Sequence, residues 1–314
     1  MDLSPIALVS EDIQSVENRM RALPIPAAAP VAAALERLLA AGGKRLRPAL
    51  ALLFGRMLQA PEEPLFQLAA ALEIVHTATL IHDDLVDQAR MRRGIPAIHT
   101  EWPAATAVLV GDFLFAWAAR LAAATGSIAV MQKFADSLAV IVDGEIRELS
   151  IAEAEYGAAG YETRIRSKTA ALFEVACRCP ALLAENPAAA EPAAEYGIAF
   201  GMAFQIADDI LDFTAESAST GKPSGQDLAR GLLTLPAIHY LASHPDDPDA
   251  PAFRAGNTGL EIRGRLFEKI RSSDAIEQAR SSARGYIDRA VECLASFPKS
   301  EYRDALESLV KSIV

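Results

Sequence analysis

The sequence predicts an all-α protein that forms one domain over residues 1–314. Its composition is 51% hydrophobic, which is enough to bury a large core. Alanine-rich runs such as 27–41 and 118–124 dominate, and alanine is the strongest helix former. The apolar/polar alternation of a half-buried strand is scarce. Because no shift in composition divides the chain, we expect a single domain.

Glycine and proline mark the ends of the expected helices. After a short helix and a Pro-rich loop within 1–30, Gly42 and Gly43 stop one helix and Pro48 opens the next. The loop over 90–96 ends a long apolar helix. Two later stretches, 217–227 and 244–258, read as connections. The expected helices are 31–41, 48–60, 64–88, 104–124, 127–150, 160–184, 188–216, 228–243, 259–271, 273–296 and 300–313.

Charge and cysteine content narrow the class of protein. The net charge of −11 argues against nucleic acid as a partner, although tight local groups of Arg and Lys suit a small anionic ligand. Three cysteines do not make a disulfide framework, and Cys177 and Cys179 read as buried small hydrophobes. Residues 1–9 do not resemble a signal peptide, and no charge-free apolar run is long enough for a transmembrane helix. We expect a soluble, cytoplasmic protein.

Two DDxxD motifs lie in apolar predicted helices. In a helix the first and last Asp of such a motif lie on one face. A single motif could be a solvated acidic patch, but these six carboxylates have apolar flanks, and clustered like charges are costly unless a cation neutralises them. The motif residues are Asp83, Asp84, Asp87, Asp208, Asp209 and Asp212.

The ligand type predicts the metal. Carboxylate oxygens without clustered Cys or His argue against a structural zinc site and suit Mg²⁺. Since Mg²⁺ is commonly completed by water and substrate phosphates, the motifs predict a bridge from carboxylates through Mg²⁺ to a diphosphate.

Basic residues could form the opposite wall of that site. Residues 42–48 read GGKRLRP, where Lys44 and Arg47 accompany exposed backbone N–H groups before a helix. Arg92 and Arg93 follow the first acidic motif, where they could form salt bridges or bind phosphate oxygens bidentately. Judged alone, residues 42–48 have a flexible surface loop as the less favoured alternative. Lys168, Thr169 and Lys222 are weaker candidates.

Together these motifs resemble the trans-isoprenyl diphosphate synthase (polyprenyl synthetase) family. The resemblance covers roughly residues 35–245. Any one DDxxD is weak, whereas the ordered set is highly specific. The matching segments are GGKRLRP at 42–48, EIVHTATLIHDDLVD at 73–87, RRG at 92–94, GD at 111–112, KTA at 168–170, FQIADDILD at 204–212 and GKPSGQDL at 221–228.

The resemblance implies a helical bundle around a deep central cavity, a homodimer, and three Mg²⁺ ions per active site. The six motif Asp would hold the metal. By the same resemblance, isopentenyl diphosphate would be bound by Lys44, Arg47, His76 and Arg93. The allylic diphosphate would be bound by Arg92, Lys168 and Lys222. Thr169, Gln205 and Phe204 would line the reacting centre, where the ring of Phe204 could stabilise positive charge.

One position departs from the family pattern, and one segment suggests a lid. The family commonly has GKxTLP where this chain has Gly231-Leu232-Leu233-Thr234-Leu235-Pro236, so Leu232 replaces a lysine and one diphosphate contact is in doubt. The reaction needs no nucleophilic triad, because Lewis-acid and electrostatic stabilisation of the departing diphosphate can suffice. Water would quench an allylic cation. Residues 217–227, with Lys222 and Asp227, are therefore a candidate lid.

Product length is expected to depend on residues preceding Asp83. A tail growing toward the helix N-terminus would pass Thr79, Ala78 and Val75. In this family, aromatic residues four and five positions before the first Asp block the tail, and here both positions are small. The floor candidates are Phe115 and Phe134. From an apolar tunnel we expect a product on the order of C30 to C50.

Several alternatives share these motifs. A geranylgeranyl diphosphate synthase differs in the tunnel floor. A class I terpene cyclase typically carries a different second metal motif, and a non-catalytic partner subunit usually loses its acidic motifs. The catalytic subunit of a heterodimer, inactive alone, would keep every motif. The sequence leaves the exact product, the primer and the destination of the product open.

Overall fold

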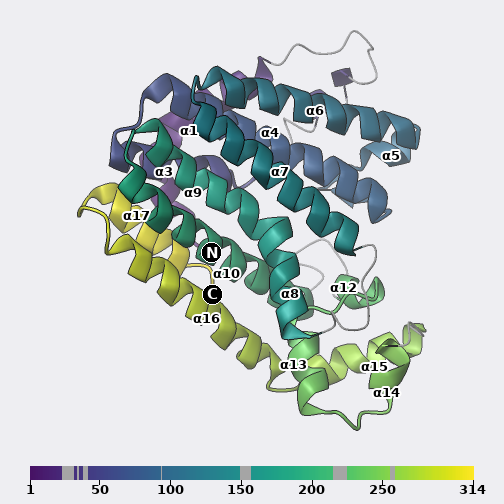
Figure 1. The fold of residues 1–314 in the computed structure, drawn as a ribbon. Coiled ribbons are helices and arrows are strands. Elements are labelled where there is room, and N and C mark those ends of the chain that lie inside the picture. The colour runs from purple at the N-terminus through teal and green to yellow at the C-terminus, as the bar shows by residue number, and fades with distance from the viewer. Residues whose placement is uncertain are drawn as a thin grey trace.

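The structure is a computed structural model that describes residues 1–22, 32–33, 35–37, 42–92, 94–148, 157–214, 225–254 and 259–314. Helices make up almost all of it, which confirms the predicted all-α class (Figure 1). The strands within these ranges are β1 (Met91–Arg92) and β2 (Ile95–Pro96), a short antiparallel pair that pairs Met91 with Pro96.

The helices follow the chain in the expected order. The first part forms η1 (Ser4–Val9), α1 (Ser10–Arg21), α3 (Leu46–Leu58), α4 (Glu62–Val86), α5 (Ile98–Glu101), α6 (Ala104–Ala124) and α7 (Ile128–Glu148). The second part forms α8 (Ala158–Ile165), η3 (Arg166–Ala170), α9 (Ala171–Leu183), α10 (Pro187–Thr214), α12 (Gln226–Ala229), α13 (Leu235–Ser243), α14 (Asp249–Arg254), α15 (Leu260–Arg271), α16 (Ala275–Leu294) and α17 (Glu301–Lys311).

Three expectations about these elements are wrong in detail. The helix expected over 160–184 contains a π-helical turn, η3, between α8 and α9. The helix expected over 228–243 is divided, because Gly231 adopts the left-handed φ of 78° and α13 starts afresh after the extended Thr234. The connections expected at 90–96 and 244–258 contain the β1–β2 pair and α14. Of the helix expected at 31–41, residues 32–33 and 35–37 are helical, and the rest lies outside the described residues.

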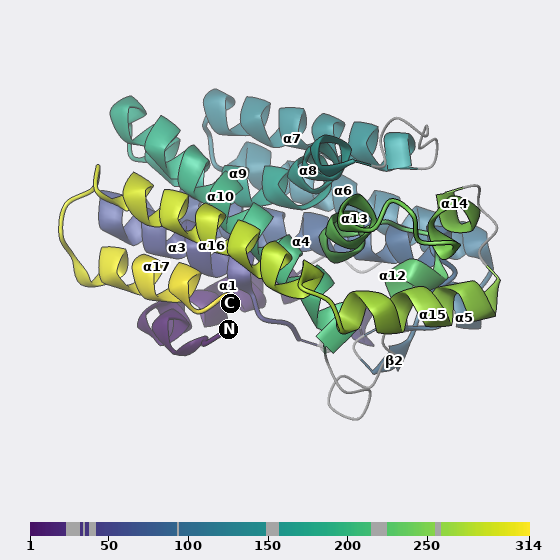
Figure 2. The same ribbon diagram turned by 90° about the horizontal axis from the view of Figure 1, so that it is seen from below.

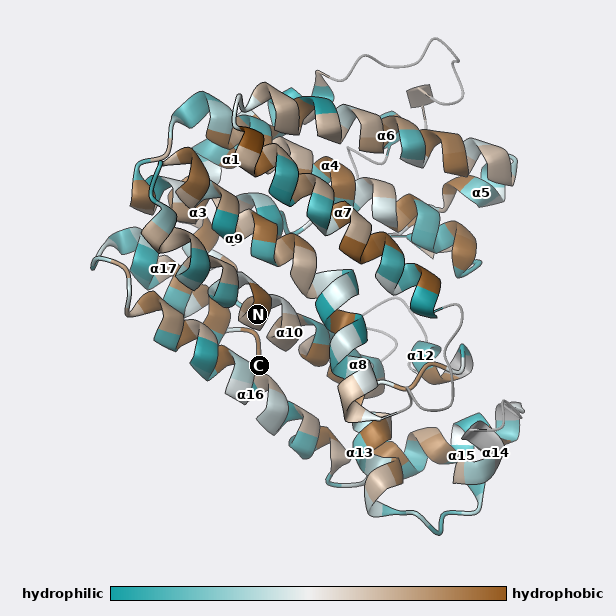
Figure 3. Ribbon diagram, viewed as in Figure 1, coloured by the Kyte–Doolittle hydropathy of each residue, from teal (hydrophilic) through white to brown (hydrophobic). Residues whose placement is uncertain are grey.

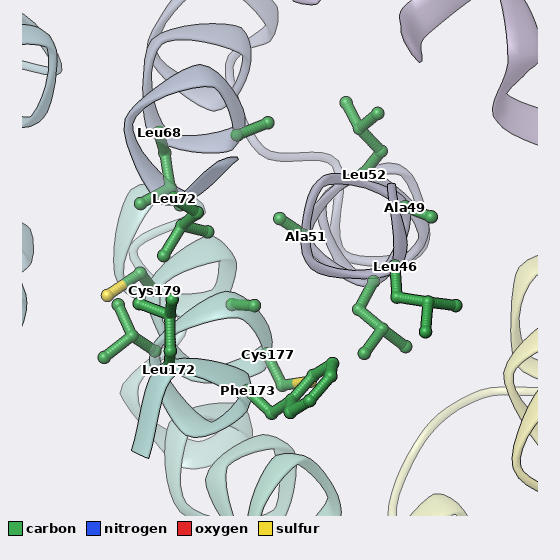
Figure 4. Packing of buried hydrophobic residues seen from close by; sticks show 14 of the residues in the cluster. Leu46, Ala49, Ala51, Leu52, Leu68, Leu72, Leu172, Phe173, Cys177 and Cys179 are labelled. Carbon is green, nitrogen blue, oxygen red and sulfur yellow. The ribbon is translucent and has the colours of Figure 1, made fainter. Parts of the chain in front are cut away.

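The core is centred on α3 and α4, which are buried on most of their surface. Figure 4 looks along α3, whose Ala51 points toward α4 and α9, the helices that α3 contacts. Cys177 and Cys179 lie in this packing and are fully buried, as expected of small apolar side chains. Burial of these faces is the main driving force for the fold.

A second apolar cluster lies at the other end of the molecule. The helix α10 contributes to both clusters, with Phe200 in the larger one and Ile206 and Phe213 in the smaller one. Figure 2 shows α12–α15 gathered at one end, away from α3 and α17. The termini lie side by side, where the Ser312 hydroxyl donates to the carbonyl of Asp2 at 3.1 Å. The acidic motifs lie toward the α12–α15 end.

Two described helices, α4 and α6, are long and apolar enough to cross a membrane by length and composition alone. In α4, 72% of the most apolar window is buried in the protein, as in the core helix of a soluble protein. In α6 the share is 39%. Its outward residues include Val108 and Leu109, and Figure 3 shows apolar stretches along α6 and α7.

Candidate functional site

The first acidic motif lies at the carboxyl end of α4. Asp84 is 4% exposed and accepts hydrogen bonds from the guanidinium of Arg92, with Nε at 2.7 Å. Arg92 belongs to β1, so the chain between α4 and β1 brings a cation back onto the motif. Asp87 ends the helix, and its backbone N–H donates to the carbonyl of Asp83 at 2.8 Å. Of the two roles that the sequence leaves open for Arg92, the structure shows the salt bridge, with Asp84.

Lys168 stands opposite Asp83. It lies in the π-helical turn η3, a form of backbone that often occurs at functional sites. Its ammonium donates to Glu145 at 3.0 Å and Glu148 at 3.4 Å, both on α7. Burial opposes the charged amine, but the carboxylates of Glu148, Glu145 and Asp83 raise the pKa of Lys168. It is therefore a fixed cation.

The second acidic motif lies on α10, and its middle residue is the most enclosed. Asp209 is 4% exposed and accepts hydrogen bonds from the Tyr161 hydroxyl at 2.6 Å and the Gln205 amide at 2.9 Å. The Thr169 hydroxyl in turn donates to the Gln205 oxygen at 2.7 Å. This network holds Asp209 in a single orientation, whereas Asp208 is exposed.

The turn η3 connects the two motifs. Lys168 faces Asp83 of the first motif, and its neighbour Thr169 reaches Asp209 of the second through Gln205. Close packing against two glycines sets the position of η3. A Cβ on Gly201 of α10 would lie 2.6 Å from the Ala170 Cα, and one on Gly144 would lie 2.8 Å from the Ser167 Cβ.

A short segment after the second motif closes the acidic cluster. Both carboxylate oxygens of Asp212 accept backbone N–H groups at the start of α12, from Gln226 at 3.1 Å and Asp227 at 3.2 Å. The segment then returns to the first motif, since the Arg230 guanidinium donates to Asp87 at 2.8 Å. Residues 143 positions apart therefore meet across the site.

Burial of like charges raises the pKa values of several carboxyls. Burial is the main cause at Asp83, raising its pKa to about 7, and at Asp209, raising it to about 8 against the hydrogen bond from Tyr161. For Asp227, burial together with nearby Asp212 raises the pKa to about 7. These groups hold protons near neutral pH unless another positive charge replaces them.

The donor set fits a hard divalent cation. Within the described ranges, no three His, Cys, Asp or Glu side chains already form a metal site by themselves. Mg²⁺ usually takes one or two carboxylates and completes its shell with water and substrate phosphates. Oxygen ligands with raised pKa values from Asp83, Asp209 and Asp227 suit such an ion, which would stabilise their charged forms.

The basic loop before α3 lies beside aromatic rings. The Lys44 ammonium is 5.7 Å from the centre of the Phe204 ring, and the Arg47 guanidinium is 4.4 Å from that of Phe173. These rings are neighbours, with centroids 5.7 Å apart. Phe204 precedes Gln205 on α10, so the loop and the second motif share one aromatic wall.

Arg45 anchors this loop. It adopts the left-handed φ of 49° and is 8% exposed. Its guanidinium donates to Glu73 of α4 at 2.8 Å and to Glu17 of α1 at 3.1 Å. His76 lies one turn beyond Glu73 on α4, and its carbonyl accepts the Thr79 hydroxyl.

The expected chain-length residues lie on α4, α6 and α7. Val75, Ala78 and Phe134 are fully buried, while Thr79 and Phe115 are half-buried. The ring of Phe115 lies 5.6 Å from that of His82. Contacts between α4 and α6 and between α6 and α7 place these helices as neighbours.

The residues expected from the sequence therefore fall into two connected groups. The acidic motifs, Arg92, Lys168, Thr169 and Gln205 form one group, and Lys44, Arg47 and Phe204 form the other. Arg93, Lys222 and most of the expected lid lie outside the described residues. Sequence reasoning missed Tyr161, Glu145, Glu148 and Arg230. Only the Glu145/Glu148 pair left a signal, an i, i+3 spacing on a helix.

Known proteins share this sequence pattern and fold. Residues 29–252 match the family described as Polyprenyl synthetase. The heptaprenyl diphosphate synthase component 2 of Geobacillus stearothermophilus is 35% identical over 308 residues, 96% of this chain and 95% of that protein. The octaprenyl diphosphate synthase of Escherichia coli (strain K12) is 34% identical over 275 residues, 85% of this chain and 84% of that protein.

A solved structure is similar over nearly the whole chain. It is a polyprenyl synthase from Caulobacter crescentus complexed with calcium and isoprenyl diphosphate. The TM-score is 0.92 at 36% identity, and the match covers 99% of this chain and 97% of that chain.

Proposed function

The chain belongs to the polyprenyl synthetase family, and on that basis we propose that it makes a long all-trans polyprenyl diphosphate. It is a prenyl transferase that joins isopentenyl diphosphate to an allylic diphosphate. The observation that carries the proposal is η3, which links the two acidic motifs through Lys168, Thr169 and Gln205. This arrangement would hold one diphosphate between two walls of carboxylates.

The residues divide the chemical task. Arg92 and Lys168 would bind the departing diphosphate and stabilise its growing charge, a form of electrostatic catalysis. Bound Mg²⁺, held by the motif Asp, would supply Lewis-acid neutralisation of the same group. The Phe204 ring would face the allylic cation, since an aromatic face attracts positive charge.

The second substrate would lie beside the basic loop. Lys44 and Arg47 would bind isopentenyl diphosphate together with His76 and Arg93. Its double bond then attacks the allylic carbon, and a proton is lost to the released diphosphate. The apolar side chains around the site would help to exclude water that quenches the cation.

We further propose Mg²⁺ as the metal, with three ions per site, and a homodimer of single-domain subunits in the cytoplasm. Oxygen-only ligands with raised pKa values support the metal assignment. A dimer is supported by exposed apolar residues on α6 and α7, such as Leu109 at 67% and Ile146 at 58%, because such surfaces commonly mark protein interfaces. The one-domain assignment is supported by α10, which joins both apolar clusters.

The long product is supported by small residues on α4. Ala78 and Thr79 leave the path before Asp83 without an aromatic side chain, and Val75 continues it. Phe115 and Phe134 are the proposed floor. The test is product analysis with Mg²⁺, isopentenyl diphosphate and a series of allylic primers. Discrete all-trans products on the order of C30 to C50 are expected if the product lies in an apolar tunnel past these small residues.

A second candidate comes from the relatives. The Geobacillus protein is named as component 2 of its synthase, so this chain could be the catalytic subunit of a heterodimer. In that case the purified chain would fold and yet give no product alone. A geranylgeranyl diphosphate synthase would instead stop at the geranylgeranyl length with every primer.

A further inference from the structure

Each carboxylate of the first acidic motif faces a cation from a different segment. Asp84 is paired with Arg92 and Asp87 with Arg230, while Lys168, which donates to Glu145 and Glu148, acts on Asp83 through its charge. The three cations come from η3, from β1 and from the turn after α12. The first two are those expected to bind the allylic diphosphate. The third cation, Arg230, likewise lies beside a carboxylate of the first motif, and no role has been assigned to it.

The contact between Arg230 and Asp87 is poorly explained as support for the fold. The side chains are 41% and 28% exposed, and an ion pair of this kind contributes little to stability. The backbone at Arg230 is nevertheless held in a turn, because its N–H donates to the carbonyls of both Gln226 and Asp227 at 3.1 Å. The Asp212 side chain caps the same α12 segment from the second motif. The guanidinium is thus held by one acidic motif and directed at the other.

The neighbouring sequence lacks a positive charge that the family pattern leads us to expect. Leu232 stands two residues beyond Arg230, and its N–H donates to the carbonyl of Asp227 at 2.9 Å. Leucine cannot bind a phosphate oxygen, whereas the arginine guanidinium can do so with two parallel hydrogen bonds. The two positions lie on one tight turn around Gly231, whose φ is 78°.

We propose that Arg230 is a ligand of the allylic diphosphate and supplies the cation that is missing at position 232. The proposal rests on the proposed prenyl transfer function. In the structure the guanidinium is paired with Asp87. A bound diphosphate would draw the guanidinium from Asp87 to its own oxygens, the role proposed above for Arg92 and Lys168.

The experiment combines binding with kinetics. Titration calorimetry measures binding of inorganic pyrophosphate in the presence of Mg²⁺ to the full chain and to Arg230→Met, Arg230→Lys and the double variant Arg230→Met/Leu232→Lys. Arg284→Met is the matched control, because Arg284 forms an exposed ion pair with Glu277 at 3.0 Å on α16. Steady-state assays give separate KM values for the allylic and the isopentenyl substrate.

Arg230→Met is expected to weaken pyrophosphate binding about tenfold, the loss of one charge-assisted contact, equivalent to about 1.4 kcal/mol. The allylic KM rises by a similar factor and the isopentenyl KM stays constant. Arg230→Lys retains most of the affinity, and adding Leu232→Lys to Arg230→Met restores it. Arg284→Met leaves both values unchanged.

Three results overturn the proposal. Pyrophosphate binding by Arg230→Met equal to that of the unaltered chain removes the ligand role. A rise confined to the isopentenyl KM assigns the residue to the other substrate. If Leu232→Lys does not restore pyrophosphate binding to Arg230→Met, Arg230 does not supply the cation missing at position 232. Absence of turnover by the unaltered chain, with tight pyrophosphate binding, contradicts the proposed function and not the role of Arg230.

Discussion

Removal of the Tyr161 hydroxyl tests the electrostatics of the second acidic motif. In Tyr161→Phe the ring volume is kept, while Asp209 loses the donor that lies 2.6 Å from its oxygen. A buried acceptor left without its partner costs about 1–3 kcal/mol, and more when it is charged. The cost should therefore depend on whether Asp209 carries its charge.

The sign of the pH dependence follows from the folded-state pKa. Burial raises the pKa of Asp209 to about 8, above its value in the unfolded chain, against the opposing hydrogen bond from Tyr161. The contribution of this group to stability is present in acid and is lost as the pH rises toward 8. Without the hydroxyl the folded pKa rises further, so this loss becomes larger and extends to higher pH.

The assay is urea denaturation of metal-free protein at about pH 6 and at about pH 9, on either side of the folded-state pKa of Asp209. The destabilisation by Tyr161→Phe should be small in acid and grow by about 1 kcal/mol at the alkaline value, because that pH lies only about one unit above the folded-state pKa of Asp209. Tyr240→Phe is the matched control, because its hydroxyl donates to Asp247 at 2.7 Å. Hydrogen bonds from Tyr240 and Lys269 outweigh burial and lower the pKa of Asp247, so it is charged at both values.

Tyr240→Phe should lower the free energy of unfolding by the same amount at the acidic and the alkaline pH. Equal destabilisation by Tyr161→Phe at the two values would refute the account of Asp209. So would a larger effect in acid.

Three further substitutions test other parts of the structure. Gly201→Ala would place a Cβ 2.6 Å from the Ala170 backbone, so it should destabilise the fold by about 1–3 kcal/mol in thermal unfolding and lower kcat. Gly264→Ala, with open space around it, should do neither. Arg45→Met leaves the buried Glu73 unpaired and should lower the free energy of unfolding in urea by about 3–5 kcal/mol. Adding Glu73→Met should recover part of this loss. If the effects of the two substitutions on the free energy of unfolding simply add, the pairing is contradicted. Ala78→Phe should shorten the product in chromatographic analysis, and an unchanged length distribution would contradict the direction of the tunnel.

The acidic motifs were predictable because their geometry is local. An i, i+4 spacing on a helix places Asp83 and Asp87 on one face whatever the rest of the chain does. Apolar flanks indicated that the carboxylates would be partly buried, and the burial of Asp84 and Asp209 agrees with this.

The turn η3 was not predictable, because its causes are distant in sequence. From the sequence, residues 166–170 are expected to form an ordinary helix. The glycines that allow this segment to pack closely, Gly144 and Gly201, lie on other helices. The hydroxyl of Tyr161 likewise reaches Asp209 across 48 positions, without any local pattern. Tertiary packing places these groups, and a single sequence does not report it.

The division of the expected 228–243 helix was readable in principle. Gly231 and Pro236 are both signals of a boundary, and the structure uses them in that way. The contact of Arg230 with Asp87 has no such signal, since it joins residues 143 positions apart.

The most direct test of the central claim is product analysis of the purified chain alone. Mg²⁺ and isopentenyl diphosphate are supplied with dimethylallyl, geranyl, farnesyl or geranylgeranyl diphosphate in parallel. The account predicts discrete all-trans products on the order of C30 to C50, the length that fits an apolar tunnel past Ala78. Folded protein that gives no product with any primer, or only the geranylgeranyl length, would contradict it.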